Sequence, residues 1–529
     1  DGLVALACAL PERGSSKALR VLHPTCGAES VLGEPVEDPT QAIAVGPALV
    51  LPAEMPGLLI RTVDVAAGAP GPTSHAATAA ALGDEALLDD AEPRVAYRAG
   101  LRWVRRYERL SLPADDTTGA GASRPLPIRE GGCYLVTGGL GGMGLTIARW
   151  LGTRWRARLV LTSRRPLPPR EAWAVPGDPS ATPGSEDMRR VIETVQAIEA
   201  AGGEVMVARA DAADEAAMGK ALAAARGRFG DLHGVFHAAG LPGRGVVARR
   251  ASAEAAREVL APKLGGLHVL HRLLDQTTLD LVVLMGSINA VIPSPGACDY
   301  SAANAVFDAF VDSASRPAAW RQVVTVDWGA WREVGMAANL PVAEGLRSQW
   351  AEHLAGAIPP QAGVEALVRV LASRRRAVVV ETYDVLRAHE LMRRRAPAGA
   401  ERTATQPSDG GDVRPPAERD VTVEVSTRPA LSTPFEPPAN DVERRLAMIW
   451  EELLGVRGIG VNDDFFELGG HSLMFTRVLA LVDVGFGTKL PLREVFDAST
   501  VRLLAQRLPT ANAGGGPNGE DETREVLEL

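Results

Sequence analysis

The sequence predicts an α/β fold in which a doubly wound, mostly parallel sheet is followed by a small helical domain. Residues 128–385 alternate short apolar runs with amphipathic segments, starting at "CYLVTGG" and ending near "AVVVETYDV", which is typical of strands alternating with helices. A glycine cluster directly follows the first of these strands. Residues 441–508 show only helical patterns, and a proline-rich stretch precedes them. Together these features indicate at least two folded domains.

Length and composition narrow the class of protein. With 529 residues the chain is too long for one hydrophobic core, and its length favours three or four domains. No apolar run reaches the ~18 residues that a membrane span needs, so we expect no membrane partner. The net charge of −9 argues against nucleic acid as the main partner. The four cysteines form no CxxC pair, so we expect no metal site and a reducing, cytoplasmic location.

The N-terminal third is predicted to be an incomplete α/β domain. The opening "DGLVALACALPE" has no basic start and no cleavage-site pattern, so it is not a signal peptide. It has the pattern of the middle of an amphipathic helix, and we expect the chain to be a piece of a longer polypeptide. Residues 1–110 continue with short apolar runs separated by proline and glycine, as strands and helices would be.

The glycine cluster lies in "YLVTGGLGGMGLTIARWL", residues 134–151. Gly139, Gly141 and Gly144 satisfy G-x-G-x-x-G, and Gly138, Gly142 and Gly144 satisfy T-G-x-x-x-G-x-G. Glycine lets the backbone turn tightly and approach a pyrophosphate, whose charge is stabilised at a helix N-terminus. Such a pattern alone is weak evidence. Here a strand precedes it and a helix follows, so we predict a dinucleotide site.

The next predicted strand, "ARLVLTSRR", ends where a ribose-binding residue is expected. It offers Ser163, Arg164 and Arg165 in place of an acid. An acid would accept hydrogen bonds from a free ribose 2′-hydroxyl, whereas arginine pairs with a 2′-phosphate. This favours NADPH over NADH. The alternative, surface arginines that close a strand, stays open for Arg165 and is weaker for Arg164.

Two further strand ends point to the same site. In "VMVARADAADEAAM", Asp211 could hydrogen-bond an adenine amine or cap the following helix. The strand in "LHGVFHAAG", residues 232–240, ends in small residues, as is needed where backbone passes close to a dinucleotide.

A group of four polar residues carries the predicted reactivity. Ser287 precedes Tyr300 by thirteen residues, and Asn304 follows four later, on the same face of a helix as Tyr300. Lys263 lies on an otherwise apolar helix upstream. Tyrosine has a pKa near ~10 and needs a nearby cation to act as an acid at neutral pH, and Lys263 could supply that cation. Singly, each residue could be structural; together, after a dinucleotide motif, they indicate catalysis.

Residues 128–385 resemble the ketoreductase domain of modular polyketide synthases, a branch of the short-chain dehydrogenase/reductase family. The matching elements are "VTGGLGGMG", "HAAG", "APKLGG", the Ser–x12–Tyr–x3–Asn spacing and "VDWGAWREVGMA". Residues 1–110 resemble the C-terminal part of that family's structural subdomain, a truncated Rossmann-like partner, on "VGPALVLPAEMPGLLIRTVDV" and "VAYRAGLRWVRRYE". The resemblance covers most of the chain.

The resemblance implies roles for individual residues. Tyr300 would donate a proton to the developing alkoxide, and Ser287 would orient the carbonyl. Lys263 and Asn304 would support the tyrosine and a proton relay, in the exchanged Lys/Asn arrangement typical of these ketoreductases. The residues expected to bind NADPH are Thr137, Gly138, Gly139, Leu140, Gly141, Gly142, Met143, Gly144, Ser163, Arg164, Arg165, Asp211, Ala212, Ala238, Ala239 and Gly240.

The C-terminal helical patterns contain "DDFFELGGHSL", in which Ser472 follows two glycines. By itself Ser472 could be a helix N-cap. Residues 441–508, however, resemble an acyl or peptidyl carrier protein, a four-helix bundle whose serine accepts 4′-phosphopantetheine. A helix N-terminus suits that phosphodiester, so capping and covalent attachment are compatible. The "GGHSL" form is similar to peptidyl carriers, which suggests an assembly line that mixes polyketide and peptide modules.

The predicted domain limits follow from these patterns. Residues 1–110 form the structural subdomain, residues 111–390 the catalytic ketoreductase, residues 391–440 a flexible linker, residues 441–510 the carrier and residues 511–529 a disordered tail. The stretch 396–440 contains eight prolines and one aromatic residue, too little apolar surface to fold. Such a linker reaches roughly 35–40 Å, and it would let the carrier visit several domains at high effective concentration.

The resemblance also implies the reaction and its partners. We expect NADPH-dependent reduction of a β-ketoacyl thioester on the carrier's phosphopantetheine arm to a β-hydroxyacyl thioester. The alternatives are reduction of an α-ketoacyl group in depsipeptide assembly, or an inert reductase that only presents the carrier. Expected partners are ketosynthase and acyltransferase domains and a phosphopantetheinyl transferase. Neither stereochemical marker of the family is present, since Leu241-Pro242-Gly243-Arg244 lacks aspartates and position 292 is isoleucine.

Overall fold

The computed structural model describes part of the chain, which falls into two units, residues 1–409 and residues 410–529. The described residues are 2–9, 19–55, 58–66, 72–88, 90, 92–110, 125–173, 186–243, 253–294, 296–339, 354–394, 426–428, 433–454, 456–465, 468, 478, 482, 486, 498 and 500–508. No described helix is long and apolar enough to cross a membrane.

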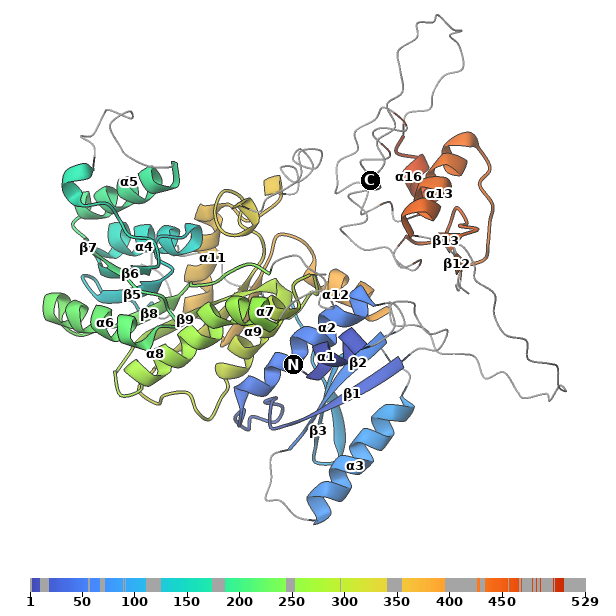
Figure 1. The fold of residues 1–529 in the computed structure, drawn as a ribbon, viewed down its shortest axis with the longest axis horizontal. Helices are drawn as coiled ribbons and strands as arrows, with labels where there is room; N and C mark the ends of the chain where they lie inside the picture. Colours follow the sequence, from blue (N-terminus) through green and yellow to red (C-terminus); the bar gives the residue numbers. More distant parts are fainter. Residues whose placement is uncertain are drawn as a thin grey trace, which may run out of the picture. The chain divides into compact units, whose positions relative to one another are not determined.

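A seven-stranded sheet forms the centre of the first unit (Figure 1), and all of its strands pair in parallel. Its order is β11-β10-β9-β8-β5-β6-β7, so the chain leaves β5 in one direction and then crosses to the other side. This confirms the predicted doubly wound α/β fold. The strands are β5 (Cys133–Thr137), β6 (Arg158–Ser163), β7 (Glu204–Arg209), β8 (Gly234–His237), β9 (Leu281–Ser287), β10 (Val323–Trp328) and β11 (Ala377–Val380).

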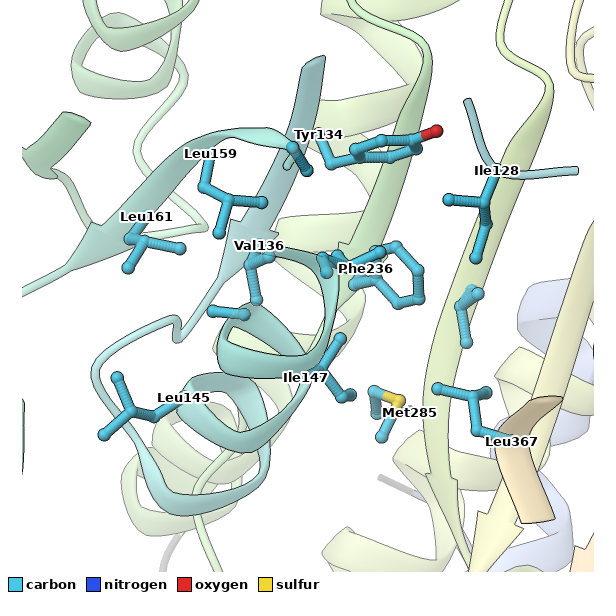
Figure 2. Packing of buried hydrophobic residues seen from close by; sticks show 14 of the residues in the cluster. Ile128, Tyr134, Val136, Leu145, Ile147, Leu159, Leu161, Phe236, Met285 and Leu367 are labelled. Carbon is cyan, nitrogen blue, oxygen red and sulfur yellow. The ribbon is translucent and has the colours of Figure 1, made fainter. Parts of the chain in front are cut away.

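Helices cover both faces of this sheet, because its central strands are apolar on both sides. Helices α4 (Gly142–Trp155), α5 (Glu186–Ala200) and α11 (Pro360–Ser373) enclose one core, part of which Figure 2 shows around Val136, Ile147 and Phe236. Helices α6 (Glu215–Phe229), α8 (Gly266–Leu274) and α9 (Cys298–Phe310) enclose the other. Shorter elements connect them: η2 (Arg170–Ala172), α7 (Ala253–Leu260), η4 (Ala261–Gly265), η5 (Ile288–Ala290), η6 (Ala337–Asn339) and α12 (Val385–Arg394).

A smaller four-stranded sheet precedes the large one, in order β1-β2-β3-β4, with only the last pair antiparallel. Its elements are α1 (Gly2–Ala9), β1 (Leu19–Cys26), η1 (Pro39–Ala44), α2 (Val45–Glu54), β2 (Leu58–Val65), α3 (Pro72–Leu87), β3 (Arg94–Arg98) and β4 (Leu101–Val104). The predicted α/β character of this region is confirmed. Buried ion pairs bind its strands together, among them Arg98 to Asp64 at 2.6 Å.

The small sheet packs on the large one through α2 and α9. A Cβ atom at Gly46 would lie 2.4 Å from the carbonyl oxygen of Cys298 and 2.6 Å from Cβ of Ala302. Glycine is therefore required where the two helices touch. Since α9 carries Tyr300 and Asn304, the smaller sheet buttresses the helix on which the predicted catalytic residues lie.

The described part of the second unit consists of α13 (Asp441–Leu454), α16 (Val501–Ala505) and the strand pair β12 (Ser426–Thr427) and β13 (Val456–Arg457). Trp450 and Phe465 pack edge to face at 4.8 Å in its core. The other helices of the predicted four-helix bundle fall outside the described residues. Within the range predicted as linker, β12 pairs with β13 and Arg428 binds buried Asp463 at 2.7 Å, so residues 426–428 pack on the carrier. Residues 395–425 and 429–432 lie outside the described part of the chain.

Candidate active site

The glycine cluster forms the turn between β5 and α4. At Gly138, Gly142 and Gly144 this turn leaves no room for a Cβ atom. Gly138 has a φ of +64°, and a Cβ there would lie 2.9 Å from the carbonyl oxygen of Ala238. A Cβ at Gly144 would lie 2.5 Å from the carbonyl oxygen of Gly138, and one at Gly142 would lie 2.4 Å from the nitrogen of Gly335. The loop is thus packed backbone to backbone, as a close approach to a dinucleotide requires.

The N-terminus of α4 opens on this loop without a capping side chain. Gly141 is the N-cap and makes no side-chain hydrogen bond. The first N–H groups of the helix can therefore donate hydrogen bonds to phosphate oxygens. Thr137 fixes the neighbouring strand end, because its carbonyl and Oγ1 accept from the backbone nitrogens of Ala238 and Ala239 at 3.2 and 3.3 Å. Leu140 is buried beneath the turn. These residues fit the pyrophosphate of a nicotinamide dinucleotide.

The residues predicted to bind the adenosine half lie at the ends of β6 and β7. Arg164 and Arg165 are exposed just beyond β6. Oγ of Ser163 accepts from the backbone N–H of Arg165 at 3.1 Å, which orders the turn. Oδ1 of Asp211 accepts from the N–H of Ala213 at 3.0 Å, while the true N-cap of α6 is Asp214. The alternative of Asp211 as the helix cap is therefore wrong: Asp211 lies three residues before the cap and shapes the turn between β7 and α6.

The four predicted catalytic residues converge at the carboxyl end of β9. Ser287 is the last residue of β9, and Tyr300 and Asn304 lie one turn apart on α9. The side chains of Ser287 and Asn304 lie next to Tyr300, where they favour the ionised form of its phenol. In addition, Nδ2 of Asn304 donates to the backbone carbonyl of Tyr300 at 2.6 Å, and its Oδ1 is buried without a hydrogen-bond partner among the described residues.

Lys263 reaches this group from η4, a π-helical turn between α7 and α8. Its Nζ donates to the carbonyl oxygen of Met285 at 2.6 Å and lies 5.6 Å from the ring centroid of Tyr300 and 4.7 Å from that of Phe307. The π-helical register of this turn directs the side chain of Lys263 inward, where it is only 2% exposed. Lysine, tyrosine, serine and asparagine are thus brought together as the spacing predicted.

Burial changes the acidity of both central groups. It lowers the pKa of Lys263 to about 7, an effect that Asp327 partly opposes. Burial also raises the pKa of Tyr300 to about 12, although the hydrogen bonds from Ser287 and Asn304 act in the other direction. The tyrosine is therefore protonated at neutral pH, and a neighbouring ammonium can stabilise its phenolate once the proton has left.

A histidine that the sequence analysis did not single out fixes the position of Lys263. His237 ends β8, and its Nδ1 lies 2.7 Å from Oγ1 of Thr137 while its Nε2 lies 3.1 Å from the carbonyl oxygen of Lys263. Burial lowers its pKa to about 4, so it is neutral. His237 thereby ties the glycine loop to the lysine-bearing turn. The sequence signal that could have identified His237 is its position as the first residue of "HAAG", at the end of a predicted strand.

Two buried aspartates near the site were also missed. Asp308 lies on α9, eight residues after Tyr300, and Asp327 lies on β10 within the apolar run "VVTVDW". Their side chains are 5% and 2% exposed. A charged residue inside an apolar strand is rarely buried without a partner, and that pattern could have identified Asp327.

Two of the residues named in the sequence analysis lie outside the described part of the chain. Ser472, the predicted attachment serine, lies outside the described residues, as does Arg244. Among the residues that the structure describes, no group of three or more histidine, cysteine, aspartate or glutamate side chains could hold a metal ion.

Two family models match the chain. The KR domain model matches residues 132–333, which contain the glycine loop and the four predicted catalytic residues, Tyr300 among them. The phosphopantetheine attachment site model matches residues 444–508, which contain Ser472. The matches imply two cofactors, a nicotinamide dinucleotide at the first domain and a covalent phosphopantetheine at the second.

The curated relatives that the chain matches are synthases several times its length. A phenolphthiocerol/phthiocerol polyketide synthase from Mycobacterium tuberculosis is 30% identical over 412 residues, 77% of this chain and 20% of that protein. The 6-methylsalicylic acid synthase of Aspergillus terreus is 35% identical over 257 residues, 48% of this chain and 13% of that protein. The chain thus spans about a fifth or less of the length of these relatives.

Solved structures agree with the fold. An A1-type ketoreductase is 26% identical with a TM-score of 0.56, and the match covers 70% of each chain. The ketoreductase from the first module of phoslactomycin biosynthesis in Streptomyces sp. HK803 is 26% identical with a TM-score of 0.58, and covers 76% of this chain and 84% of that one. This chain therefore joins a ketoreductase domain of the polyketide synthase type, an oxidoreductase, to a phosphopantetheine carrier domain.

Proposed function

We propose that this chain reduces a β-ketoacyl thioester, held on the phosphopantetheine arm of a carrier domain, to a β-hydroxyacyl thioester with NADPH. The observation that carries the proposal is the convergence of Tyr300 with Ser287, Asn304 and Lys263 beside the glycine loop. Bound NADPH would supply the hydride for the carbonyl carbon. The complete set of four also argues against an inert scaffold.

The roles of the residues follow from their surroundings. With substrate bound, the neighbouring hydroxyl groups of Tyr300 and Ser287 would both donate to the carbonyl oxygen and so orient it. As negative charge develops on that oxygen, Tyr300 gives up its proton. Lys263, 5.6 Å from the tyrosine ring, stabilises the phenolate that remains. Asn304 holds the turn of α9 that carries Tyr300 through its 2.6 Å bond to the backbone.

The choice of NADPH rests on Arg164. It is exposed at the end of β6, and within the described part of the chain its guanidinium makes no ion pair. A guanidinium in this position can pair with the 2′-phosphate that distinguishes NADPH from NADH. Asp211 and Ala212, at the end of the neighbouring strand β7, would line the adenine.

The carrier would present the substrate. In this proposal, residues 111–390 form the reductase on the structural subdomain of residues 1–110, residues 391–440 tether the carrier of residues 441–510, and residues 511–529 form its tail. Ser472 would receive phosphopantetheine from a transferase, and ketosynthase and acyltransferase domains in the cytoplasm would supply the ketone. The polyketide synthase relatives support this setting.

The test is reduction of matched β-ketoacyl and α-ketoacyl thioesters with NADPH, followed by intact mass and chiral analysis of the product. We expect the β-ketoacyl substrates to be reduced faster. Faster reduction of the α-ketoacyl thioester would indicate depsipeptide assembly instead. Absence of reduction of both, in folded protein that binds NADPH, would indicate a scaffold.

A further inference from the structure

A line of polar side chains runs along α9 from the active site into the protein interior. Tyr300, Asn304 and Asp308 are spaced four residues apart and therefore share one face of the helix. Asn304 is fully buried and Asp308 is 5% exposed. Polar groups buried this deeply need partners, because an unpaired one loses its bonds to water without replacement. The burial of Asp308 therefore requires a partner for its carboxyl group.

Asp308 faces a second buried acid, Asp327. The register of the sheet pairs Asp327 on β10 with Gly286 on β9, one residue before Ser287. A Cβ at Gly286 would lie 2.1 Å from Oδ1 of Asp327 and 3.0 Å from Oγ1 of Thr325. The aspartate thus occupies space that only glycine leaves open. It lies directly beneath the strand end that carries Ser287.

The two carboxyl groups interact with each other, and their charges are not equivalent. Two carboxyls this close in a buried site cannot both be ionised, so the pair keeps a proton. Burial raises the pKa of Asp308, but the guanidinium groups of Arg105 and Arg94 favour its ionised form, whereas the cation that acts on Asp327 is Lys263. Burial and the neighbouring Asp308 raise the pKa of Asp327 well above its usual range. The proton therefore resides on Asp327, which donates to Asp308.

Further buried polar atoms surround the pair. Oγ of Ser301, Oγ1 of Thr325, and Oδ1 of Asn304, Asp308 and Asp327 have no hydrogen-bond partner among the described residues. Buried polar atoms are nearly always satisfied by protein or by ordered water. A group of them between α9 and β10 is suited to bridging waters that connect the carboxyl pair with the active site.

The proposed function requires that Tyr300 regain a proton after each reduction. Tyr300 is half-buried, and Lys263 beside it interacts electrostatically with Asp327. We propose, on the basis of that function, that Asp327 is a positioning residue that stores the proton with which Tyr300 is recharged through Lys263 after each turnover. Asp308 would keep that proton on Asp327.

The proton steps balance without any oxidant or reductant. The phenolic proton of Tyr300 goes to the alkoxide of the product, and the O–H bond of the phenol breaks. One N–H proton of the Lys263 ammonium then goes to the phenolate, which is downhill because the pKa of the lysine is about 7 and that of the tyrosine about 12. The neutral amine takes the proton of the Asp327 carboxyl through bridging water. Solvent water finally reprotonates the Asp327 carboxylate.

The test compares the first turnover with later ones. Asp327→Asn keeps the size and a hydrogen-bonding amide but holds no transferable proton. In rapid-mixing experiments with NADPH and a diffusible β-ketoacyl thioester, we expect its first turnover to match that of the wild type, because Tyr300 starts protonated. Its steady-state rate should then fall about tenfold or more, a typical share of acid–base catalysis. Before the slow phase the variant should consume one equivalent of NADPH per chain for the proton on Tyr300, and up to a second equivalent where Lys263 starts as the ammonium.

Two further variants control for packing. Thr325→Ser is the matched control: it trims a side chain on the same strand and face that is equally buried but keeps the hydroxyl group, and it should leave the ratio of first to later turnovers unchanged. Asp308→Asn removes the charge that keeps Asp327 protonated, so it should show the same split in weaker form. This variant also decides the matter if Asp327→Asn fails to fold.

Three outcomes would overturn the proposal: equal slowing of first and later turnovers in the aspartate variants, no slowing at all, or the same split in Thr325→Ser. Each leaves the proposed function standing, because the wild type would still reduce the thioester. A wild type that does not oxidise NADPH with any thioester would refute the proposed function itself.

Discussion

Gly144→Ala should weaken NADPH binding with little change in overall stability. The new Cβ would lie 2.5 Å from the carbonyl oxygen of Gly138 and 3.1 Å from Cα of Gly139, whereas ordinary contacts begin at 3.4 Å. Both neighbours are backbone atoms, so the glycine loop itself has to retreat by roughly 1 Å. Such overpacking costs about 1–3 kcal/mol. Because alanine favours a helix over glycine by about 1 kcal/mol, the net loss of folding free energy is about 0–2 kcal/mol.

The cofactor should be affected more than the fold, since the displaced loop is the one that would contact the pyrophosphate. A loss of 1–3 kcal/mol in binding corresponds to roughly 5- to 150-fold weaker affinity. Titration of NADPH fluorescence measures the affinity, and urea denaturation measures stability. Gly219→Ala in α6 is the matched control, because its Cβ would meet only Leu273 at 3.9 Å; it should stabilise the domain and leave NADPH affinity unchanged. Wild-type NADPH affinity in Gly144→Ala would refute this account of the loop.

Three further predictions concern the cofactor, the lysine and the carrier. Arg164→Ala should raise the KM for NADPH and leave use of NADH nearly unchanged, because only the contact to the 2′-phosphate is lost; equal loss with both cofactors would show a structural role. Lys263→Met should abolish reduction yet raise the melting temperature, and more so at pH 6 than at pH 10. The reason is that burial lowers the pKa of Lys263 from 10.5 to about 7, so the unfolded chain binds the extra proton across that window and stability rises with pH in the wild type; a lower melting temperature at pH 6 would contradict this. Ser472→Ala should prevent the mass increase that a phosphopantetheinyl transferase and coenzyme A produce, while reduction of a free thioester continues; a variant that is still modified would place the attachment site elsewhere.

The sequence was sufficient to predict the parallel sheet and the group around Tyr300, for physical reasons that are local. Apolar strands alternating with amphipathic helices specify a doubly wound sheet, and Tyr300 and Asn304 are brought together by helical spacing alone. Ser287 was assigned from its spacing to Tyr300 and from the resemblance to ketoreductases, and its place at the carboxyl end of β9 is where a ligand crevice is expected in such a sheet.

Other features depend on packing that spacing does not encode. The π-helical turn that points Lys263 inward, and the imidazole of His237 that binds its carbonyl, result from contacts between η4 and β8. Asp308 and Asp327 are 19 residues apart in the sequence, and only the packing of α9 on β10 makes them a pair. Likewise, the pairing of β12 with β13 within the predicted linker depends on the buried Arg428–Asp463 ion pair, which composition cannot reveal.

The central claim is that Tyr300 supplies the proton in a reduction at this site. Tyr300→Phe removes only the phenolic oxygen and preserves the packing of the ring, so the direct measurement is kcat/KM of this variant for a diffusible β-ketoacyl thioester with NADPH, alongside its NADPH affinity. The account predicts a loss of about 100- to 10,000-fold in kcat/KM, the usual contribution of a general acid, with unchanged NADPH binding. Turnover close to that of the wild type would contradict it.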